Sequence, residues 1–368
     1  MFRPLTNRRL TTVRVFRLGT DMTTLNSAKI AVGILSFAHY HANFWSEVFK
    51  ASNVLVGIWD DNHERGREAA QRFDVPFFQN INDLFKLCTA VAICSQTNQH
   101  RQLIEKSVRR GLAVLSEKPL SVSMSEGLKI KKCIDRYGTT FMQSFPKRFD
   151  PVSHYLKKLI DEQTLGKISL VRIRHGHFYG LDPEFCKRWY VQPDFSGGGA
   201  LLDEGVHGAD LLVWIFGLPQ SVTGLISHEA LGLGVEDLGI AIYKFSSGMV
   251  AELTASFSFA AADTSIEIYG SEGTVLVSAV DLASKEITSS GFVRLYQKSN
   301  SVRIWQDISI TPQFKMGEFH QQNAHAFLKC LRENSTPPIT IDDGLRAQLM
   351  IETAYLSAKK GKKIAITQ

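Results

Sequence analysis

Short apolar runs alternate with amphipathic stretches along the first 145 residues of the chain. These runs are residues 29–35, 54–59, 90–94 and 113–116. Such runs are typical of strands that are buried on both faces of a parallel sheet. A stretch with helical periodicity follows each of them, and Gly111 and Gly138 mark two expected helix ends. This alternation predicts βαβ units that build a doubly wound α/β domain.

The pattern changes after Pro151. Helices are expected at 153–162 and 200–216, with a strand at 168–177 between them. Residues 221–310 consist almost entirely of strand-like segments, and two helices are expected to close the chain at 317–333 and 343–360. The second part is therefore expected to be α+β with a large, mostly antiparallel sheet. The predicted division is an extension at 1–28, a dinucleotide-binding domain at 29–148 and a substrate-binding and oligomerisation domain at 149–368.

One predicted strand of this sheet has a fully apolar face. Met249, Ala251, Leu253, Ala255 and Phe257 share one parity, whereas the opposite parity is mixed. One face of the sheet should therefore pack on helices. The other face is either a solvated surface or an interface between copies of the chain.

Composition excludes several classes of protein. Apolar residues make up 44% and charged residues 21% of the 368 positions, which is ordinary for a globular chain and unlike a disordered, coiled-coil or collagenous one. No apolar run approaches the roughly 18 residues that span a bilayer, so no membrane partner is expected. The five cysteines are scattered without metal-finger spacing, which favours a reducing, cytoplasmic location and no metal site.

Most of the net charge of +6 lies near the N-terminus. Residues 1–21 hold five arginines and one acid, a contribution of 5 − 1 = +4, so the rest of the chain carries only +2. A nearly balanced body argues against a nucleic-acid partner. The basic segment has the composition of a mitochondrial transit peptide or of a disordered extension. Alternatively, translation starts at Met22 and the segment is not part of the protein.

The strand ends carry the first candidate chemistry. Ligands of doubly wound folds bind at the carboxyl ends of the strands, and dinucleotides favour a glycine-rich turn there. Here Ser36 and Ala38 replace the first two glycines, with Phe37 and His39 in the same turn. Asp60 follows the second strand 24 residues after Ser36, which is the spacing of a ribose-binding carboxylate. A carboxylate there, next to Asp61, favours NAD over NADP; alternatively, Asp60 is a solvated acid that ends a strand.

The expected helix at 200–216 is the sharpest signal. Asp203, His207 and Asp210 recur at i, i+4 and i+7 within an otherwise apolar stretch, which places them on one helix face. Three interpretations stay open from these residues alone. They form a catalytic set, or a buried polar stripe in which both carboxylates bond His207, or a metal site with His175 and His177.

Taken together, the motifs make the chain resemble the Gfo/Idh/MocA family of nicotinamide-dependent oxidoreductases. The resemblance covers about residues 29–366 and departs from the family in the glycine turn and at Gln96. The matching blocks are Ser95 with His100, Glu117-Lys118-Pro119, Arg148-Phe149-Asp150-Pro151, Gly197 to Asp210, and Tyr269 to Thr274.

The resemblance implies a fold, an activity and a site. The fold is an N-terminal Rossmann domain followed by a domain with a large open sheet, through which members form homodimers or homotetramers. The activity is hydride transfer between NAD and a secondary alcohol of a sugar, polyol or cyclitol. His207 acts as acid/base, Lys118 polarises the oxygen and Asp203 positions substrate or orients the base. Residues expected to bind the dinucleotide are Ser36, Phe37, Ala38, His39, Asp60, Ser95, Thr97, His100, Glu117 and Lys118.

The individual substrate is not readable from the sequence. Candidate substrate contacts are Arg148, His175, His177, Tyr179 and Trp189, together with Asp203 and His207. Two alternatives remain open: an enzyme that oxidises transiently with tightly bound NAD to hydrolyse or eliminate a sugar derivative, and a non-catalytic dinucleotide-binding sensor.

Overall fold

The computed structural model describes residues 30–261, 264–281, 286–287, 293–298, 304–312 and 316–367. The expectations for residues 1–28 lie outside these ranges.

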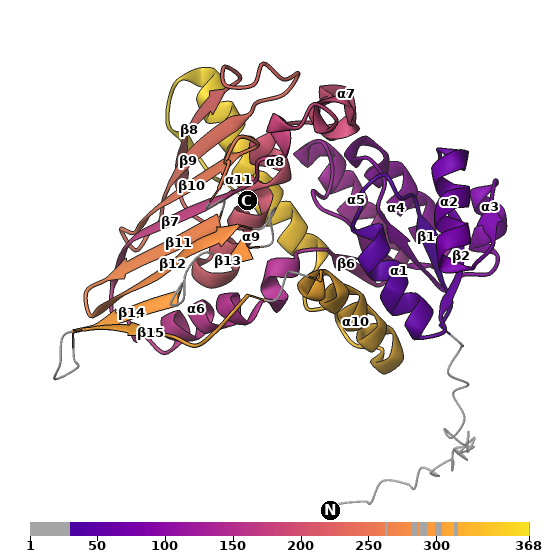
Figure 1. Ribbon diagram of the computed structural model, residues 1–368, viewed down its shortest axis with the longest axis horizontal. Helices are drawn as coiled ribbons and strands as arrows, with labels where there is room; N and C mark the ends of the chain where they lie inside the picture. The colour runs from indigo at the N-terminus through magenta and orange to yellow at the C-terminus, as the bar shows by residue number, and fades with distance from the viewer. Residues whose placement is uncertain are drawn as a thin grey trace, which may run out of the picture.

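The first part of the chain forms a parallel sheet with helices on both faces (Figure 1). Its elements are β1 (Val32–Leu35), α1 (Ala42–Ala51), β2 (Leu55–Trp59), α2 (His63–Phe73), β3 (Phe77–Phe78), α3 (Ile81–Phe85), β4 (Ala90–Ile93), α4 (His100–Val108), β5 (Ala113–Ser116), α5 (Met124–Tyr137) and β6 (Phe141–Gln143). The strand order is β3-β2-β1-β4-β5-β6. The order reverses between β1 and β4, where Val32 pairs with Ala90, so the binding crevice is expected at the carboxyl ends of these two strands.

The apolar composition of these strands follows from their position. Every residue of β1, β4 and β5 is buried, because helices cover both faces of the sheet. The doubly wound prediction is therefore confirmed, with strand limits that differ by a few residues at most.

The second part forms a larger mixed sheet. Its elements are α6 (Pro151–Asp161), β7 (Ile168–Gly176), α7 (Pro193–Ser196), α8 (Ala200–Asp203), α9 (Gly205–Phe216), β8 (Ser221–Ser227), β9 (Leu238–Lys244), β10 (Val250–Ser256), β11 (Thr264–Gly270), β12 (Gly273–Asp281), β13 (Glu286–Ile287), β14 (Val293–Gln297), β15 (Trp305–Asp307), α10 (Glu318–Glu333), α11 (Ile341–Lys360) and β16 (Ile364–Ala365). The order is β15-β14-β12-β11-β7-β10-β9-β8-β16, with β13 paired to β12. Among these pairings only β7 with β10 is parallel.

The two faces of this sheet differ as the parity predicts. Ala251, Leu253 and Ala255 are fully buried on the side that α8, α9 and α11 cover (Figure 1). On the opposite face Ile242 is 45% exposed and Leu225 is 63% exposed. The apolar face was correctly predicted, and an interface between copies of the chain on the other face stays a prediction.

Two features of the fold differ from what the sequence pattern predicts. The single helix expected at 200–216 is two helices with a break at Glu204, where Gly205 begins α9. The C-terminal helices also return to the parallel part, since α10 packs on α1 and α11 on α5 (Figure 1). The two parts therefore share an interface to which helices from early and late in the chain contribute. None of the helices in the described ranges combines the length and apolar character needed to cross a membrane.

Candidate active site

A cavity of about 450 Å³ lies between the carboxyl edge of the parallel sheet and the α8–α9 region. The turn after β1 contributes His39 and His41, and the segment after β5 contributes Lys118. His175, at the end of β7, and His207, on α9, reach it from the other side. Segments far apart in the sequence thus meet at the edge where a doubly wound fold binds ligands.

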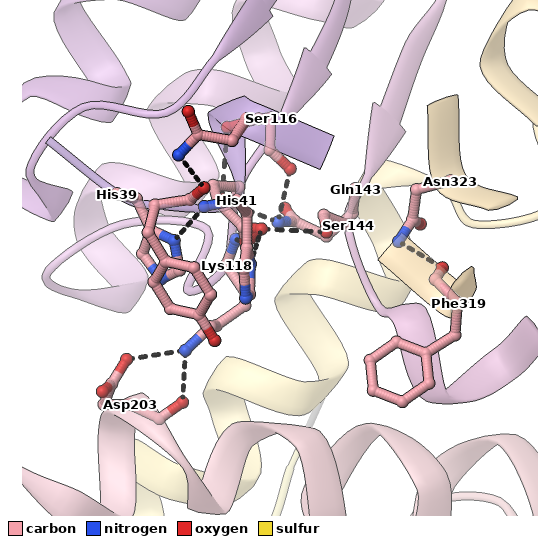
Figure 2. A network of polar contacts seen from close by, with 12 residues as sticks. His39, His41, Ser116, Lys118, Gln143, Ser144, Asp203, Phe319 and Asn323 are labelled. Carbon is pink, nitrogen blue, oxygen red and sulfur yellow. Dashed lines mark hydrogen bonds and ion pairs between the residues drawn. The ribbon is translucent and has the colours of Figure 1, made fainter. Parts of the chain in front are cut away.

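Lys118 connects the two parts of the molecule across this cavity. Its Nζ lies 2.7 Å from Asp203 Oδ1 and 3.0 Å from the Asp203 carbonyl oxygen, as Figure 2 shows. Burial alone would lower the pKa of Lys118, but the carboxylates of Asp203, Glu204 and Glu117 outweigh it and raise this pKa to about 12. Lys118 is therefore an ammonium group at neutral pH, able to donate to an oxygen but not to act as a base.

Glu204 enters the site because the helix breaks at this residue. One carboxylate oxygen, Oε2, lies 2.9 Å from His175 Nδ1, and the other, Oε1, lies 3.7 Å from His177 Nε2 and 3.8 Å from Lys118 Nζ. Burial would raise the pKa of Glu204, but His175 and the Lys118 ammonium lower it well below its usual value. Glu204 is therefore a partly buried carboxylate among cationic and imidazole groups.

His207 faces the cavity without a fixed partner for one ring nitrogen. Its Nδ1 has no hydrogen-bond partner in the described part of the chain, and its ring lies 5.1 Å, centroid to centroid, from that of His175. Burial, with Lys118 and His175 nearby, lowers the pKa of His207 well below 6.5. A neutral imidazole beside a fixed ammonium is suited to accept a proton from a hydroxyl that the ammonium polarises.

The polar stripe on the expected helix is divided between two sites. Asp203 bonds Lys118, whereas Asp210 forms a buried ion pair with Arg148, with 2.6 Å between Asp210 Oδ1 and an Arg148 guanidinium nitrogen. Arg148 also pairs with Asp343 at 3.0 Å. Neither carboxylate bonds His207 in the described structure, so the expectation that Asp203 orients this base is not what the geometry shows.

Two predicted substrate contacts lie outside the cavity. Arg148 is engaged by two carboxylates that link α9 and α11. Trp189 donates from Nε1 to the carbonyl oxygen of Ala38 at 3.1 Å and stacks on Tyr190, so it ties the second part of the chain to the first. His175, His177 and Tyr179 do line the cavity.

At the end of the site where a ribose is expected, groups of the chain itself occupy the hydrogen-bonding positions of the Asp60 carboxylate. Asp60 is fully buried and accepts from the backbone N–H groups of Phe37 and Asn62, at 2.7 and 2.8 Å. Arg65 binds both Asp60 oxygens, at 2.6 and 2.9 Å, and reaches Asp61 and Ser36 as well. Ser36 adopts φ 74° in the turn, a conformation that favours glycine.

The loop after β4 and the segment after β5 are bound to each other. His100 Nδ1 lies 2.8 Å from the Pro119 carbonyl oxygen, and its Nε2 lies 3.3 Å from that of Ser95. Ser95 and Thr97 are almost completely buried, as is Glu117, whose Oε1 lies 2.6 Å from His41 Nδ1. Except for Lys118 and His39, the predicted dinucleotide-binding residues lie outside the cavity lining.

The residues present fit a dinucleotide. Helix α1 begins beside the cavity with no side-chain cap and no acidic residue in its first turn, which leaves its positive end available to a phosphate. The buried Oε1 of Gln96, after β4, has no partner among the described residues. Asp60, at the end of β2, is an acceptor in the position of a ribose-binding carboxylate, and in this structure its oxygens accept from Phe37, Asn62 and Arg65.

Several residues around the cavity were not predicted as part of the site. The titratable ones among them include His41, Lys147, Glu204 and His320. Glu204 had a signal, because it is a further carboxylate in an apolar helix. His41 and His320 had none, because the chain brings them together only through the packing of α10 on α1.

Family comparisons agree with this arrangement. Residues 30–145 match the oxidoreductase family with an NAD-binding Rossmann fold, and residues 153–276 match the GFO/IDH/MocA C-terminal domain. Inositol 2-dehydrogenase of Rhizobium meliloti is 26% identical over 287 residues, covering 75% of this chain and 80% of that protein. Levoglucosan dehydrogenase of Pseudarthrobacter phenanthrenivorans is 23% identical, covering 94% of this chain and 99% of that protein.

Solved structures with low sequence identity share the fold. A levoglucosan dehydrogenase in complex with NADH and levoglucosan superposes with a TM-score of 0.79 at 20% identity, covering 92% of this chain and 100% of that one. GenD2 from gentamicin A biosynthesis, in complex with NAD, gives 0.78 at 20% identity, covering 92% and 97%. The two family matches together span more than half of the sequence, and the chain belongs to the Gfo/Idh/MocA family of NAD-binding oxidoreductases.

Proposed function

We propose that this oxidoreductase transfers a hydride between NAD and a secondary alcohol of a sugar, polyol or cyclitol. The single observation that carries the proposal is the position of the Lys118 ammonium, 2.7 Å from Asp203, in the same cavity as the neutral His207. A sensor that only binds a dinucleotide has no need of this pair. The substrate class is supported by relatives named as inositol and levoglucosan dehydrogenases.

The bound dinucleotide supplies the hydride acceptor, and the chain supplies position and charge. Lys118 donates to the substrate oxygen and stabilises the negative charge that develops there. His207 accepts the hydroxyl proton, and returns it in the reverse direction. Asp203 fixes the Lys118 amine through two contacts, so its role in this proposal is to position the ammonium group.

The dinucleotide is proposed to lie along the edge formed by the turn after β1, Asp60, the loop after β4 and the Glu117–Lys118 segment. We propose that NAD is preferred over NADP, because Asp60 and Asp61 follow β2, the position from which a carboxylate contacts the adenosine ribose in doubly wound folds. The Arg65 guanidinium is paired with both carboxylates, so it is not available to bind a 2′-phosphate.

The uncovered face of the large sheet is proposed as the surface of a homodimer or homotetramer. Its exposed large apolar side chains include Leu225 and Ile242. Sedimentation of a monomer at micromolar concentration would contradict this assembly. The cytoplasmic location is likewise a proposal, supported by five free cysteines.

A substrate screen tests the function. The enzyme is mixed with NAD and a panel of sugars, polyols and cyclitols, and NADH is quantified against the oxidised product. Equal amounts of NADH and ketone support the dehydrogenase. Product without net NADH would instead indicate transient oxidation coupled to hydrolysis or elimination, and no turnover with any member of the panel would count against the substrate class.

A further inference from the structure

The Glu204 carboxylate and the His177 imidazole face each other across a gap in the cavity wall. Glu204 lies at the break between α8 and α9, and His177 directly follows β7. Both side chains line the cavity. Glu204 Oε1 lies 3.7 Å from His177 Nε2 and 3.8 Å from Lys118 Nζ, and both separations are longer than a hydrogen bond. A single polar atom between the two side chains can close this gap.

The surroundings of His177 determine which of its ring nitrogens carries the proton. His177 Nδ1 accepts from the backbone N–H of Tyr179 at 3.2 Å, and the ring stacks on Phe257 with 5.1 Å between the centroids. Burial lowers the pKa of His177, so the ring is neutral at neutral pH. A neutral imidazole that accepts at Nδ1 carries its proton on Nε2. The nitrogen that faces Glu204 is therefore a donor.

The Glu204 carboxylate is an acceptor that the Lys118 ammonium does not need. Although burial would raise the pKa of Glu204, its neighbours lower it well below the usual value, so the group is ionised at neutral pH. Asp203 already offers the ammonium two oxygens, at 2.7 and 3.0 Å. His175 Nδ1 lies 2.9 Å from Glu204 Oε2 but has no partner with hydrogen-bond geometry among the described residues. Pairing within the chain therefore does not account for Oε1.

Few chemical groups can bridge this donor and this acceptor. The bridging atom has to accept from His177 Nε2–H and donate to Glu204 Oε1. An ammonium group only donates, and a carboxylate or phosphate oxygen only accepts, whereas a hydroxyl group does both. A divalent cation would require a lone pair on His177 Nε2 and would lie beside the Lys118 ammonium. The pair is therefore complementary to a hydroxyl group.

The position of Glu204 relative to Lys118 limits which substrate hydroxyl it can bind. In the proposed reaction, Lys118 donates to the oxygen of the alcohol that is oxidised. A hydroxyl bound to Glu204 Oε1 would lie close to that oxygen, because Lys118 Nζ and Glu204 Oε1 are 3.8 Å apart. Oxygens on adjacent carbons can occupy such neighbouring positions, whereas oxygens on opposite sides of a sugar ring cannot.

We propose that Glu204, together with His177, binds the hydroxyl group on a carbon next to the reacting one, so that the enzyme selects vicinal diols. Hydrogen bonds to an ionised carboxylate are stronger than those between neutral groups. A substrate without this hydroxyl leaves a carboxylate oxygen and an N–H unpaired, and sites of this kind reject deoxy analogues. The inference rests on the proposed function for the reacting oxygen. It goes beyond that function because it names a specificity-determining residue and the substrate feature that this residue recognises.

Matched pairs of polyols test this requirement on the full-length enzyme with NAD. The probes are myo-inositol and D-glucose, each compared with its monodeoxy analogues, and product analysis identifies the carbon that is oxidised. The wild type is expected to prefer the parent over an analogue that lacks the adjacent hydroxyl by roughly 10- to 100-fold in kcat/KM. Dissociation constants for the enzyme–NADH complex, measured by NADH fluorescence, give the same comparison without turnover.

Substitutions show whether Glu204 causes the preference. Glu204→Ala is expected to lower kcat/KM for the parent but not for the adjacent deoxy analogue, so that the preference disappears. A carboxylate that only supports the charge of Lys118 would instead lower both values by the same factor. Glu229→Gln, at an exposed glutamate outside the cavity lining, is the control and should keep the preference. Circular dichroism establishes that each variant is folded, and Glu204→Gln replaces Glu204→Ala where the latter is not.

Three results would overturn the role of Glu204. They are a wild type that treats the parents and all their monodeoxy analogues alike, a preference that persists in a folded Glu204 variant, and a wild type that binds none of the probes. A failure of the proposed function gives a different result. In that case the parents bind with a preference that depends on Glu204, but no probe is oxidised, which contradicts the dehydrogenase activity and retains the hydroxyl-binding role.

Discussion

The Asp60 end and the Lys118 end of the site satisfy their polar groups in different ways. At Asp60 the chain provides every partner, since two backbone N–H groups and the Arg65 guanidinium bind the carboxylate. In the cavity, His207 and His320 each keep a buried ring nitrogen without a partner among the described residues. The fold alone satisfies the first region, whereas the second keeps polar atoms to which a ligand can bind. Substitutions of Lys118 and His207 should therefore lower the rate of the reaction. Substitutions in ion pairs that the chain itself completes should instead change the free energy of unfolding or the preference between NAD and NADP.

The largest effect is expected for Lys118→Ala. This substitution removes the ammonium that stabilises negative charge on the substrate oxygen, so kcat should fall by roughly two to four orders of magnitude. NAD affinity, measured by fluorescence titration, should change much less. Lys129→Ala, at an exposed lysine of α5, is the control. A folded Lys118→Ala enzyme with normal kcat would remove Lys118 from the reaction.

Asp210→Asn tests a saturated pair inside the same helix region. Asp210 is 1% exposed and bound to Arg148, and burial raises its pKa to about 6 against the opposing effect of Arg148. Breaking a buried pair costs about 3–5 kcal/mol, so the free energy of unfolding should fall while kcat of the folded fraction is kept. Lys86→Ala, in an exposed pair with Asp83, should cost about 0–1 kcal/mol. Loss of kcat without loss of stability would place Asp210 with Lys118 instead.

Acid should destabilise the cavity region through its histidines. Burial, with help from Lys147, lowers the pKa of His175 to about 4, so the unfolded chain binds a proton first as the pH falls below about 6.5. The stabilising contribution is present above that pH and is lost between pH 6.5 and about 4. It amounts to about 3 kcal/mol for this group. Chemical denaturation at several pH values in this range should show that the free energy of unfolding depends less steeply on pH in His175→Asn than in the wild type. The variant of an exposed histidine, His63→Asn, should show the same pH dependence as the wild type.

The smallest effect concerns the choice of cofactor. Dissociation constants should favour NAD over NADP by about tenfold or more, because a 2′-phosphate would approach two carboxylates whose Arg65 partner is engaged. Asp60→Asn should narrow that ratio. Tighter binding of NADP by the wild type would show instead that Arg65 leaves the carboxylates for the phosphate.

The sequence predicts the framework better than the partners of individual side chains. Ala251, Leu253 and Ala255 are buried as their parity requires, since a strand with one covered face has only one way to place them. Lys118, Asp203 and His207 line one cavity, and the roles that the family resemblance implies for them stay predictions. The break at Glu204, the pairing of Asp210 with Arg148 and the contact of His41 with His320 depend on packing between distant segments, which periodicity does not encode.

The most direct test of the central claim is the rate of hydride transfer in His207→Ala, measured in a single turnover with NAD bound. The substitution removes the neutral imidazole beside Lys118 and leaves the Asp60 end of the site unchanged. We predict a folded protein that binds NAD almost normally and transfers hydride roughly two to four orders of magnitude more slowly than the wild type. A folded, NAD-binding His207→Ala protein with a near-normal rate on its true substrate would contradict the account.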